Sequence, residues 1–498
     1  MKKVLTIILD GFGINEQKDG NAIMQAETRN FDKLMANYPN CSLHASEGYV
    51  GLPNGQFGNS EVGHMSIGAG RKLKQDGPRI DEYLENKDIL KDENILAIVE
   101  YLKQTGKTLH VIGLLSDGGV HSNFSHIKEL LNSFDELGIS KIKIHAITDG
   151  RDTSPSSAIN YLKEIEELKI GNIATICGRY YAMDRDNKWE RTKKYYELIV
   201  RGIGVKARNV EDVINACYKK EIFDEFVPPI SIDANGSIMD GDVVFWFNYR
   251  NDRARQILMA LTDKSFKRFM VKEYQDLKVL SFYPQEKNIK VINLLEDVEI
   301  VNPLGVYLSK LGLTQARIAE TEKYAHVTYF FDGGSEEKLE GCDKFLIPSP
   351  NVATYDLKPE MSAVDVTKRC VACMEEDYDF IFMNFANPDM VGHTGDMEAT
   401  IKAVMAVDIC LGKLLEVAED NFYTVVVMSD HGNADMMLDE SGNMITTHTI
   451  NKVPFVITDK KLQLKNGDLT NVAPTILNYM DIAIPKEMSS KSLIVKDE

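Results

Sequence analysis

The first strand-like run of the chain, Val4-Leu5-Thr6-Ile7-Ile8-Leu9, ends in Asp10-Gly11-Phe12-Gly13. Six apolar residues are too few for a signal peptide core or a membrane span, so the run predicts a buried strand. Before residue 76 it is followed only by one probable helix, at residues 30–37, and a glycine-rich region at residues 48–70. One strand and one helix cannot form a core, so we expect this segment to pack against a distant part of the sequence.

Residues 77–305 alternate strand-like and helical patterns, which predicts an α/β fold with a doubly wound sheet. Helical patterns cover residues 125–137 and 156–168. The expected strands are 108–115, 141–148, 172–177, 243–247 and 278–282.

The same alternation resumes beyond residue 305. Strand-like runs cover residues 316–319, 380–385, 424–428 and 453–457. We therefore expect two doubly wound α/β domains. One is discontinuous, formed by residues 1–76 and 306–498, and the other is an insertion formed by residues 77–305.

Composition excludes several classes of protein. The net charge of −18 argues against nucleic acid as a partner, and no window is long and apolar enough to span a membrane. Seven cysteines, an odd number, predict reduced thiols and a cytoplasmic location. Cys370 and Cys373 form a single C-x-x-C within a helical pattern, which indicates buried thiols rather than a zinc or redox site.

Three carboxylates, Asp10, Asp389 and Asp430, stand at or just beyond the ends of buried strands. In a parallel sheet these ends share one edge, where the carboxylates would repel each other without a cation. Three histidines accompany them: His393, His431 and His448. Mixed aspartate and histidine ligands suit Mn²⁺ or Zn²⁺ better than Ca²⁺, and their number predicts two divalent ions.

Gly58-Asn59-Ser60-Glu61-Val62-Gly63-His64 sets a serine between small neighbours, as a nucleophile on a tight turn requires. Serine needs an activator at neutral pH. Bound metal could lower the pKa of its hydroxyl. Activation of Ser60 by His64 is less favoured than activation by metal, because no strand-end aspartate remains to orient the histidine. The plain structural alternative is that Ser60 caps a helix beginning at Glu61.

Arginines follow the strands of the inserted segment. Five of them converging at one edge of an acidic protein predict a site for phosphate or carboxylate, which guanidinium binds bidentately. These residues, with one histidine, are His121, Arg151, Arg179, Arg185, Arg250 and Arg253.

Taken together, these motifs resemble the cofactor-independent phosphoglycerate mutases of the alkaline phosphatase superfamily. The resemblance runs from end to end and includes residues 58–64, 115–122, 149–153, 178–185, 320–328 and 384–395. It implies one metal site at Asp389, His393 and His448. It implies a second at Asp10, Ser60, Asp430 and His431.

The resemblance also implies a reaction: interconversion of 3-phosphoglycerate and 2-phosphoglycerate through a phosphoserine at Ser60, without 2,3-bisphosphoglycerate. Asp152 would move protons on the glycerate hydroxyls. The residues implied to hold the substrate are His121, Arg151, Asp152, Arg179, Arg185, Arg250, Arg253 and Lys323.

We expect a monomer that takes a small-molecule substrate and two metal ions, with Mn²⁺ preferred on ligand type and Mg²⁺, Co²⁺ and Zn²⁺ left open. Two chain crossings between the domains would permit hinge closure. The rival functions are a phosphatase or sulfatase of the same superfamily, a phosphopentomutase, and a metal-binding protein without catalysis.

Overall fold

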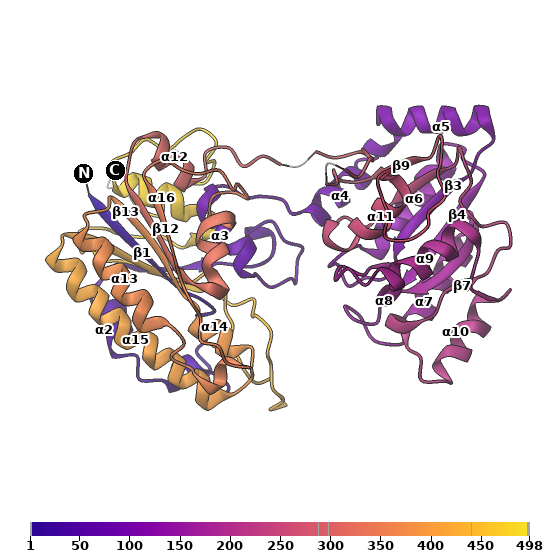
Figure 1. Cartoon of the computed structure of the whole chain (residues 1–498). Coiled ribbons are helices and arrows are strands. Elements are labelled where there is room, and N and C mark those ends of the chain that lie inside the picture. Colours follow the sequence, from indigo (N-terminus) through magenta and orange to yellow (C-terminus); the bar gives the residue numbers. More distant parts are fainter. Residues whose placement is uncertain (1, 287, 297, 440, 496–498) are drawn as a thin grey trace. The chain divides into compact units, whose positions relative to one another are not determined.

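The computed structural model describes residues 2–495 apart from residues 287, 297 and 440. The chain forms two compact units (Figure 1). Unit 1 consists of Met1–Gln75 and Glu299–Glu498, and unit 2 of Asp76–Val298. The sequence places these boundaries after residues 76 and 305, whereas in the structure they lie after residues 75 and 298. Each unit has an eight-stranded sheet with helices on both faces, so the predicted α/β class is confirmed.

The sheet of unit 1 is mostly parallel. Its strand order is β12 (Cys342–Ile347), β11 (Gln315–Glu320), β13 (Phe380–Phe385), β1 (Lys3–Leu9), β14 (Tyr423–Met428), β15 (Val453–Ile457), β2 (Asn40–His44) and β16 (Gly467–Asp468). The first five of these strands run parallel, and β15 is antiparallel to both of its neighbours.

Strand β1 lies in the middle of this sheet, between two strands from the far end of the sequence. Val4 pairs with Phe380 of β13 on one side and with Thr424 of β14 on the other. The expectation that the first segment packs against a distant part of the chain is therefore confirmed. Because parallel strands share their carboxyl edge, the residues that follow β1, β13 and β14 meet there.

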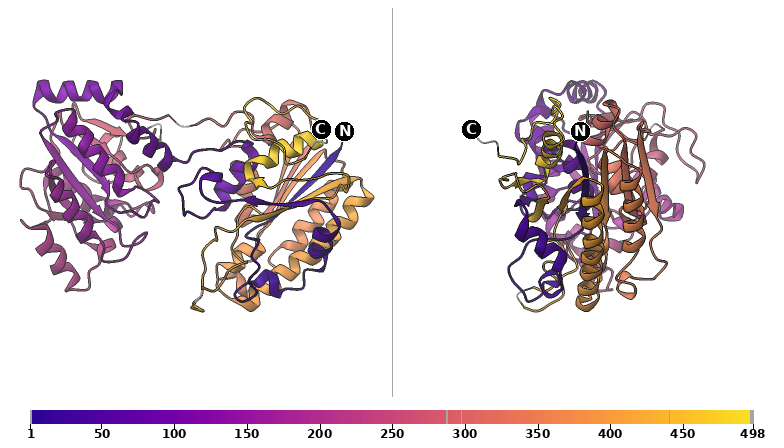
Figure 2. Two further views of the ribbon diagram at one scale, coloured as in Figure 1. Left: turned by 180° about the vertical axis from the view of Figure 1, so that it is seen from behind. Right: turned by 90° about the vertical axis from the view of Figure 1, so that its left-hand side faces the viewer.

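Side chains alternate between the two faces of this sheet, and each face carries its own core. Phe380 and Phe382 face one core, whereas Ile381 and Met383 face the other. The first core is covered by α3 (Ser60–Ala69), α12 (Leu304–Lys310) and α16 (Val472–Tyr479). The second is covered by α1 (Ala22–Gln25), α2 (Arg29–Asn37), α13 (Ala363–Glu375) and α15 (Met397–Asp420) (Figure 2).

Unit 2 repeats this plan with a second sheet. Its order is β10 (Ile292–Asn293), β9 (Lys278–Ser281), β8 (Val243–Trp246), β3 (Leu109–Leu114), β4 (Ile142–Thr148), β5 (Asn172–Gly178), β7 (Ile230–Ser231) and β6 (Val205–Lys206). One face packs on α4 (Asp76–Glu85), α5 (Glu93–Thr105), α6 (Phe124–Glu136), α7 (Ala158–Leu168) and α10 (Val210–Tyr218). The other packs on α8 (Arg179–Ala182), α9 (Trp189–Arg201) and α11 (Arg255–Thr262).

Several short helical turns connect these elements. They include η1 (Glu47–Tyr49), η2 (Asp88–Leu90), η3 (Asp224–Phe226), η4 (Asn251–Arg253), η5 (Thr321–Lys323), a π-helical turn at His326–Phe330, η7 (Tyr355–Leu357) and η8 (Leu469–Asn471). No helix in the described part of the chain combines the length and apolarity needed to cross a bilayer. Cys370 and Cys373 are buried in α13 as predicted, and all seven cysteines are free thiols.

Candidate metal centre and anion site

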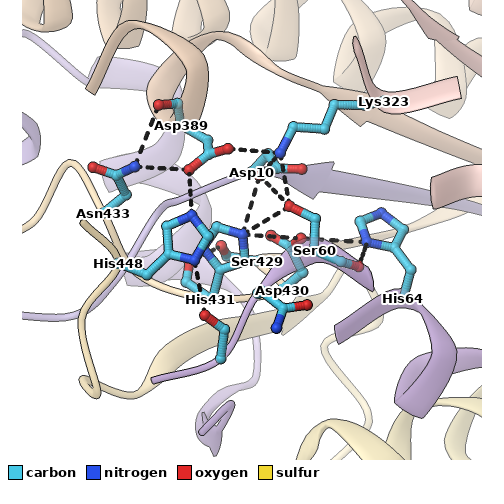
Figure 3. Close-up of polar contacts among 12 residues, drawn as sticks. Asp10, Ser60, His64, Lys323, Asp389, Ser429, Asp430, His431, Asn433 and His448 are labelled. Atoms are coloured by element: carbon cyan, nitrogen blue, oxygen red, sulfur yellow. Dashed lines mark hydrogen bonds and ion pairs between the residues drawn. The ribbon is translucent and has the colours of Figure 1, made fainter. Parts of the chain in front are cut away.

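The carboxyl edge of the unit 1 sheet gathers the three strand-end carboxylates (Figure 3). Asp10 follows β1, Asp430 follows β14, and Asp389 lies in α14 (Asn387–Gly392), which follows β13. All three are buried, and Asp10 and Asp430 have no exposed surface. Gly11 permits this convergence, because its φ is +73° and a Cβ there would lie 2.8 Å from the Cα of Asp389.

Ser60 is the first residue of helix α3. The helix begins at Ser60 rather than at Glu61, and Asn59 is its cap, with Oδ1 accepting from Val62 N at 2.9 Å. The alternative in which Ser60 is the cap is therefore wrong. Gly63 lets helix α3 pack closely against the loop that follows β14, since a Cβ there would lie 2.9 Å from the carbonyl oxygen of Asp430. The second glycine of the motif is thus required by close packing.

The Ser60 hydroxyl lies among charged and titratable groups. Its Oγ is 2.8 Å from Nε2 of His431, 3.3 Å from Oδ1 of Asp10 and 2.7 Å from Nζ of Lys323. Lys323 also contacts Asp10 at 2.7 Å and Asp389 at 2.6 Å. The surrounding carboxylates raise the pKa of Lys323 against the effect of burial, so this lysine stays an ammonium ion. One lysine against three carboxylates leaves the site with excess negative charge.

Three histidines arrange their rings in the same way. Nδ1 donates to a backbone carbonyl in each: His448 to Gly58 at 2.8 Å, His393 to Thr446 at 2.7 Å and His431 to Gly432 at 3.3 Å. A carbonyl can only accept, so each Nδ1 carries the proton and each Nε2 keeps its lone pair. This is the outer contact that typically fixes a metal-ligating histidine.

The free Nε2 atoms of His393 and His448 point to the same place. They lie 3.1 Å from each other and 3.3 and 3.2 Å from Oδ1 of Asp389. Two imidazole nitrogens and a carboxylate oxygen at these distances are suited to share a cation. The three residues expected for the first metal site are therefore brought together.

The second expected set also converges. Nε2 of His431 lies 3.4 Å from Oδ1 of Asp10 and 3.5 Å from Oδ2 of Asp430. Both oxygens of Asp430 are buried without a hydrogen-bond partner among the described residues, as expected for metal ligands. Burial lowers the pKa of His431 to about 3, which keeps its ring neutral and able to ligate. Burial, with the Asp430 carboxylate, raises the pKa of Asp10 to about 7. The residues present fit two divalent cations.

His64 differs from these histidines. Its Nδ1 donates to the Ser60 carbonyl at 2.9 Å and lies 3.3 Å from Asp430. Its Nε2 accepts from Nδ2 of Asn384 at 3.2 Å, so its lone pair is used. Asn384 also donates to Oδ2 of Asp10 at 2.7 Å. His64 and Asn384 therefore form a layer behind the carboxylates. Asn433, whose Nδ2 donates to Asp389 at 2.7 Å, extends this layer.

In unit 2 the strand-end arginines also gather, together with carboxylates that the sequence did not single out. Asp252 contacts Arg185 at 2.7 Å, Arg250 at 3.4 Å and His121 at 3.7 Å. Glu225 contacts Arg151 at 2.8 Å. Asp252 lies between the predicted Arg250 and Arg253, whereas Glu225 lies on η3 and no strand-end pattern indicates it.

Among the described residues, no carboxylate forms an ion pair with Arg253. Its Nη1 donates to the carbonyl of Met183 at 2.9 Å, and its Nε is buried without a partner among the described residues. Burial and the nearby Arg185 and Arg179 lower the pKa of Arg253. Burial, with Arg179, also lowers the pKa of His121 to about 4, so this ring is neutral near pH 7. This cluster can bind an anion.

Known proteins match the whole chain. A family model described as the metalloenzyme superfamily matches residues 2–484. The 2,3-bisphosphoglycerate-independent phosphoglycerate mutase of Clostridioides difficile (strain 630) is 46% identical over 512 residues, which is 99% of both chains. The enzyme of the same name from Bacteroides thetaiotaomicron is 45% identical over 501 residues, again 99% of both.

A solved structure of Leishmania mexicana phosphoglycerate mutase, obtained at low cobalt concentration, is similar in fold. Its TM-score is 0.73 at 29% identity, and the match covers 100% of this chain and 98% of that one. The arrangement of the candidate metal ligands, the arginine cluster and the full-length identity of about 45% all indicate the same family. This chain belongs to the family of 2,3-bisphosphoglycerate-independent phosphoglycerate mutases, within the metalloenzyme superfamily.

Proposed function

We propose that this enzyme interconverts 3-phosphoglycerate and 2-phosphoglycerate through a phosphoserine at Ser60, without 2,3-bisphosphoglycerate. The observation that carries the proposal is the position of Ser60 Oγ, 2.7 Å from Lys323 and 2.8 Å from His431 at the carboxyl edge of the sheet. A hydroxyl placed among cationic and metal-ligating groups is suited to take a phosphoryl group.

Two divalent ions would be held by residues of unit 1, and we propose Mn²⁺ for both because the ligands mix nitrogen and oxygen. One set is Asp389, His393 and His448; the other is Asp10, Ser60, Asp430 and His431. Bound there, the ions would supply Lewis acidity that lowers the pKa of a hydroxyl and balances charge on phosphate.

Individual residues of the chain then carry out the steps of the reaction. Ser60 Oγ, as the alkoxide, forms a bond to phosphorus while the bond from phosphorus to the glycerate oxygen breaks. The Lys323 ammonium stabilises charge on the phosphoryl oxygens. Asp152 gives a proton to the departing glycerate oxygen. In the second half the other glycerate hydroxyl returns a proton to Asp152 and attacks the phosphoserine, which restores Ser60.

Glycerate must stay bound between the two half-reactions. We propose that the arginine cluster and His121 hold its carboxylate, and that unit 2 delivers it to Ser60 by closure about the segments near residues 75–78 and 301–307. Closure would also exclude water, which otherwise would hydrolyse the phosphoserine. Arg253 and Arg179 each have a buried Nε without a partner among the described residues, which supports both as carboxylate ligands.

A metal-dependent phosphatase of the same superfamily is the second candidate, because it would share the metal ligands. It would have no need for a carboxylate-binding arginine cluster, so the geometry of unit 2 favours the mutase.

The seven free cysteines support a reducing, cytoplasmic compartment. We also propose that the enzyme acts as a monomer in glycolysis and gluconeogenesis.

One assay tests the reaction and its independence from an added phosphate donor. Purified enzyme is given 3-phosphoglycerate and Mn²⁺ with no 2,3-bisphosphoglycerate, and products are followed by ³¹P NMR. We expect 2-phosphoglycerate to form. Release of inorganic phosphate without 2-phosphoglycerate would instead identify a phosphatase.

A further inference from the structure

Asp149, a residue outside the sites described so far, lies beneath the Gly150-Arg151-Asp152 turn that follows β4. Its carboxylate accepts four hydrogen bonds. The donors are Ser116 Oγ at 2.6 Å, the backbone N–H groups of Arg151 at 3.1 Å and Asp152 at 3.0 Å, and Arg179 Nη1 at 2.6 Å. Because these donors come from three different strand ends, one buried carboxylate fixes how the loops of the anion site meet.

Arg179 differs from the other arginines of this site. Its Nη1 bridges Asp149 at 2.6 Å and Asp152 at 2.5 Å. Its side chain is 2% exposed, whereas the side chains of Arg151, Arg185 and Arg250 are about half exposed. Nη1 of this guanidinium is therefore engaged by both carboxylates, whereas its Nε is buried without a partner among the described residues.

The two carboxylates that share Arg179 have different surroundings. Asp149 is 1% exposed in its side chain and Asp152 is 16% exposed. Burial alone would raise the pKa of Asp149, but the hydrogen bonds from Ser116, Asp152 N–H and Arg179 outweigh burial and lower it. Asp149 therefore remains a fixed negative charge. Paired carboxylates in unlike environments commonly divide their roles in this way.

We propose that Asp149 is a positioning residue that, through Arg179 and the turn at residues 150–152, holds Asp152 where it exchanges protons with glycerate. This inference rests on the proposed mutase function, in which Asp152 moves those protons. It gives Nη1 of Arg179 the support of Asp152 as a role in addition to its place in the anion site.

The test compares Asp149→Asn with the matched control Asp233→Asn in the holoenzyme. Asp233 also lies in unit 2 and bonds a lysine and an asparagine, Lys143 and Asn172, but Asn172 begins β5, at the opposite end of the strand from Arg179. For each variant kcat and KM for 3-phosphoglycerate are measured between pH 5.5 and 9. Thermal unfolding and equilibrium binding of 3-phosphoglycerate are recorded in parallel.

We expect Asp149→Asn to lower kcat by about 10- to 100-fold, because a misplaced catalytic group costs about this much. KM and substrate affinity should change less than about threefold, since the anion-binding arginines are untouched. The alkaline limb of the kcat profile, which requires Asp152 to be protonated in the first half-reaction, should move down by about one pH unit, because Arg179 would then pair with Asp152 alone. Asp233→Asn should match the wild type in all of these.

Two results would overturn the inference: a folded Asp149→Asn variant with wild-type kcat, or one whose kcat falls while its pH profile stays fixed and KM rises. If Asp149→Asn does not fold, Ser116→Ala takes its place. It removes the 2.6 Å hydrogen bond to Asp149 and should lower kcat by about 3- to 10-fold at nearly constant KM. A wild-type enzyme that forms no 2-phosphoglycerate would instead refute the underlying function, whatever the variants do.

Discussion

Nε2 of His431 lies 2.8 Å from Oγ of Ser60, although 371 residues separate them in the sequence. The hydroxyl that we propose as nucleophile is thus positioned by a residue that follows β14, and β14 pairs with the strand that ends at Leu9. Catalysis therefore depends on correct assembly of the whole unit 1 sheet.

Replacing Ser60 with alanine should lower mutase kcat by about 10³-fold or more, because loss of a nucleophile removes the covalent route. Metal content should stay close to that of the wild type, since the aspartate and histidine ligands remain. The control is Ser66→Ala, a buried serine on the same helix α3, which should keep full activity. Mass spectrometry of quenched wild-type enzyme should locate phosphate on Ser60. A phosphate on any other residue would contradict the prediction.

Removing the metal ions with a chelator should abolish activity reversibly. Three buried carboxylates then face one another without their cations, so the melting temperature should fall as well. At a metal concentration about 100 times Kd, bound metal contributes about 2.7 kcal/mol per site. Adding Mn²⁺ should restore both activity and stability, whereas Ca²⁺, which prefers oxygen ligands, should restore little. Full activity in metal-free protein would disprove the two-ion site.

Replacing Asn384 with alanine should weaken metal binding by about 10- to 100-fold, the usual cost of losing a group that orients the ligands. The side chain donates to Asp10 at 2.7 Å and to His64 at 3.2 Å, so its loss frees both. Calorimetric titration with Mn²⁺ measures the effect. Asn387→Ala is the control, because its side chain donates to the Pro359 carbonyl instead. Equal Mn²⁺ affinities in the two variants would show that the Asn384 side chain does not contribute to metal binding.

Arg253→Ala should reduce kcat/KM for 3-phosphoglycerate by about 10- to 150-fold, the equivalent of one hydrogen bond to a charged group at about 1.5–3 kcal/mol. Release of inorganic phosphate should rise relative to isomerisation, because glycerate would leave before it is phosphorylated again. Arg208→Ala, which alters an exposed arginine elsewhere in unit 2, provides the comparison. If both variants behave like the wild type, the arginine cluster has no catalytic function.

Glu320 should make unit 1 less stable as the pH rises from 5 to 8. Burial raises the pKa of this residue from 4.5 to about 7 in the folded chain. A raised carboxyl pKa gives a stabilising contribution that is complete below the unfolded value of about 4.5. The contribution is lost as the pH passes the folded value, at about 1.4 kcal/mol per unit and about 3 kcal/mol at most.

Calorimetric melting of Glu320→Gln at several pH values tests this. The variant should lose part of the wild-type decline in stability between pH 5 and 8, although its overall stability falls slightly because Ser349 and Ser362 both donate to Glu320. Glu322→Gln on the same turn is exposed and should leave the decline unchanged. An unaltered pH dependence in Glu320→Gln would show that Glu320 is ionised in the folded protein throughout.

Much of the fold was predictable because buried strands leave long apolar runs. The predicted strand at residues 380–385 coincides with β13, and most of the others differ by a residue at one end. Strands β2 and β12 were missed. Both have polar or exposed residues at alternate positions, as expected near the edge of a sheet, and give no continuous apolar run.

Residues that follow strands were equally predictable, because parallel strands present their carboxyl ends together. The supporting residues were not. Asn384 lies inside β13, and neither Asp252 nor Asp149 is among the site residues that the sequence predicts. Their roles follow from contacts between strands that are far apart in sequence, such as Asp149 with Arg179. A single sequence carries no periodicity that reports such contacts.

The central position of β1 also bears on how the protein is made. The ribosome produces β1 long before its two partner strands, which begin only at Phe380 and Tyr423. At about 5–20 residues per second, this strand waits on the order of tens of seconds with its backbone unpaired. Unit 2, which is contiguous in sequence, emerges during that interval. Nascent chains of this enzyme should therefore depend on chaperones that shield the N-terminal strand until translation is nearly finished.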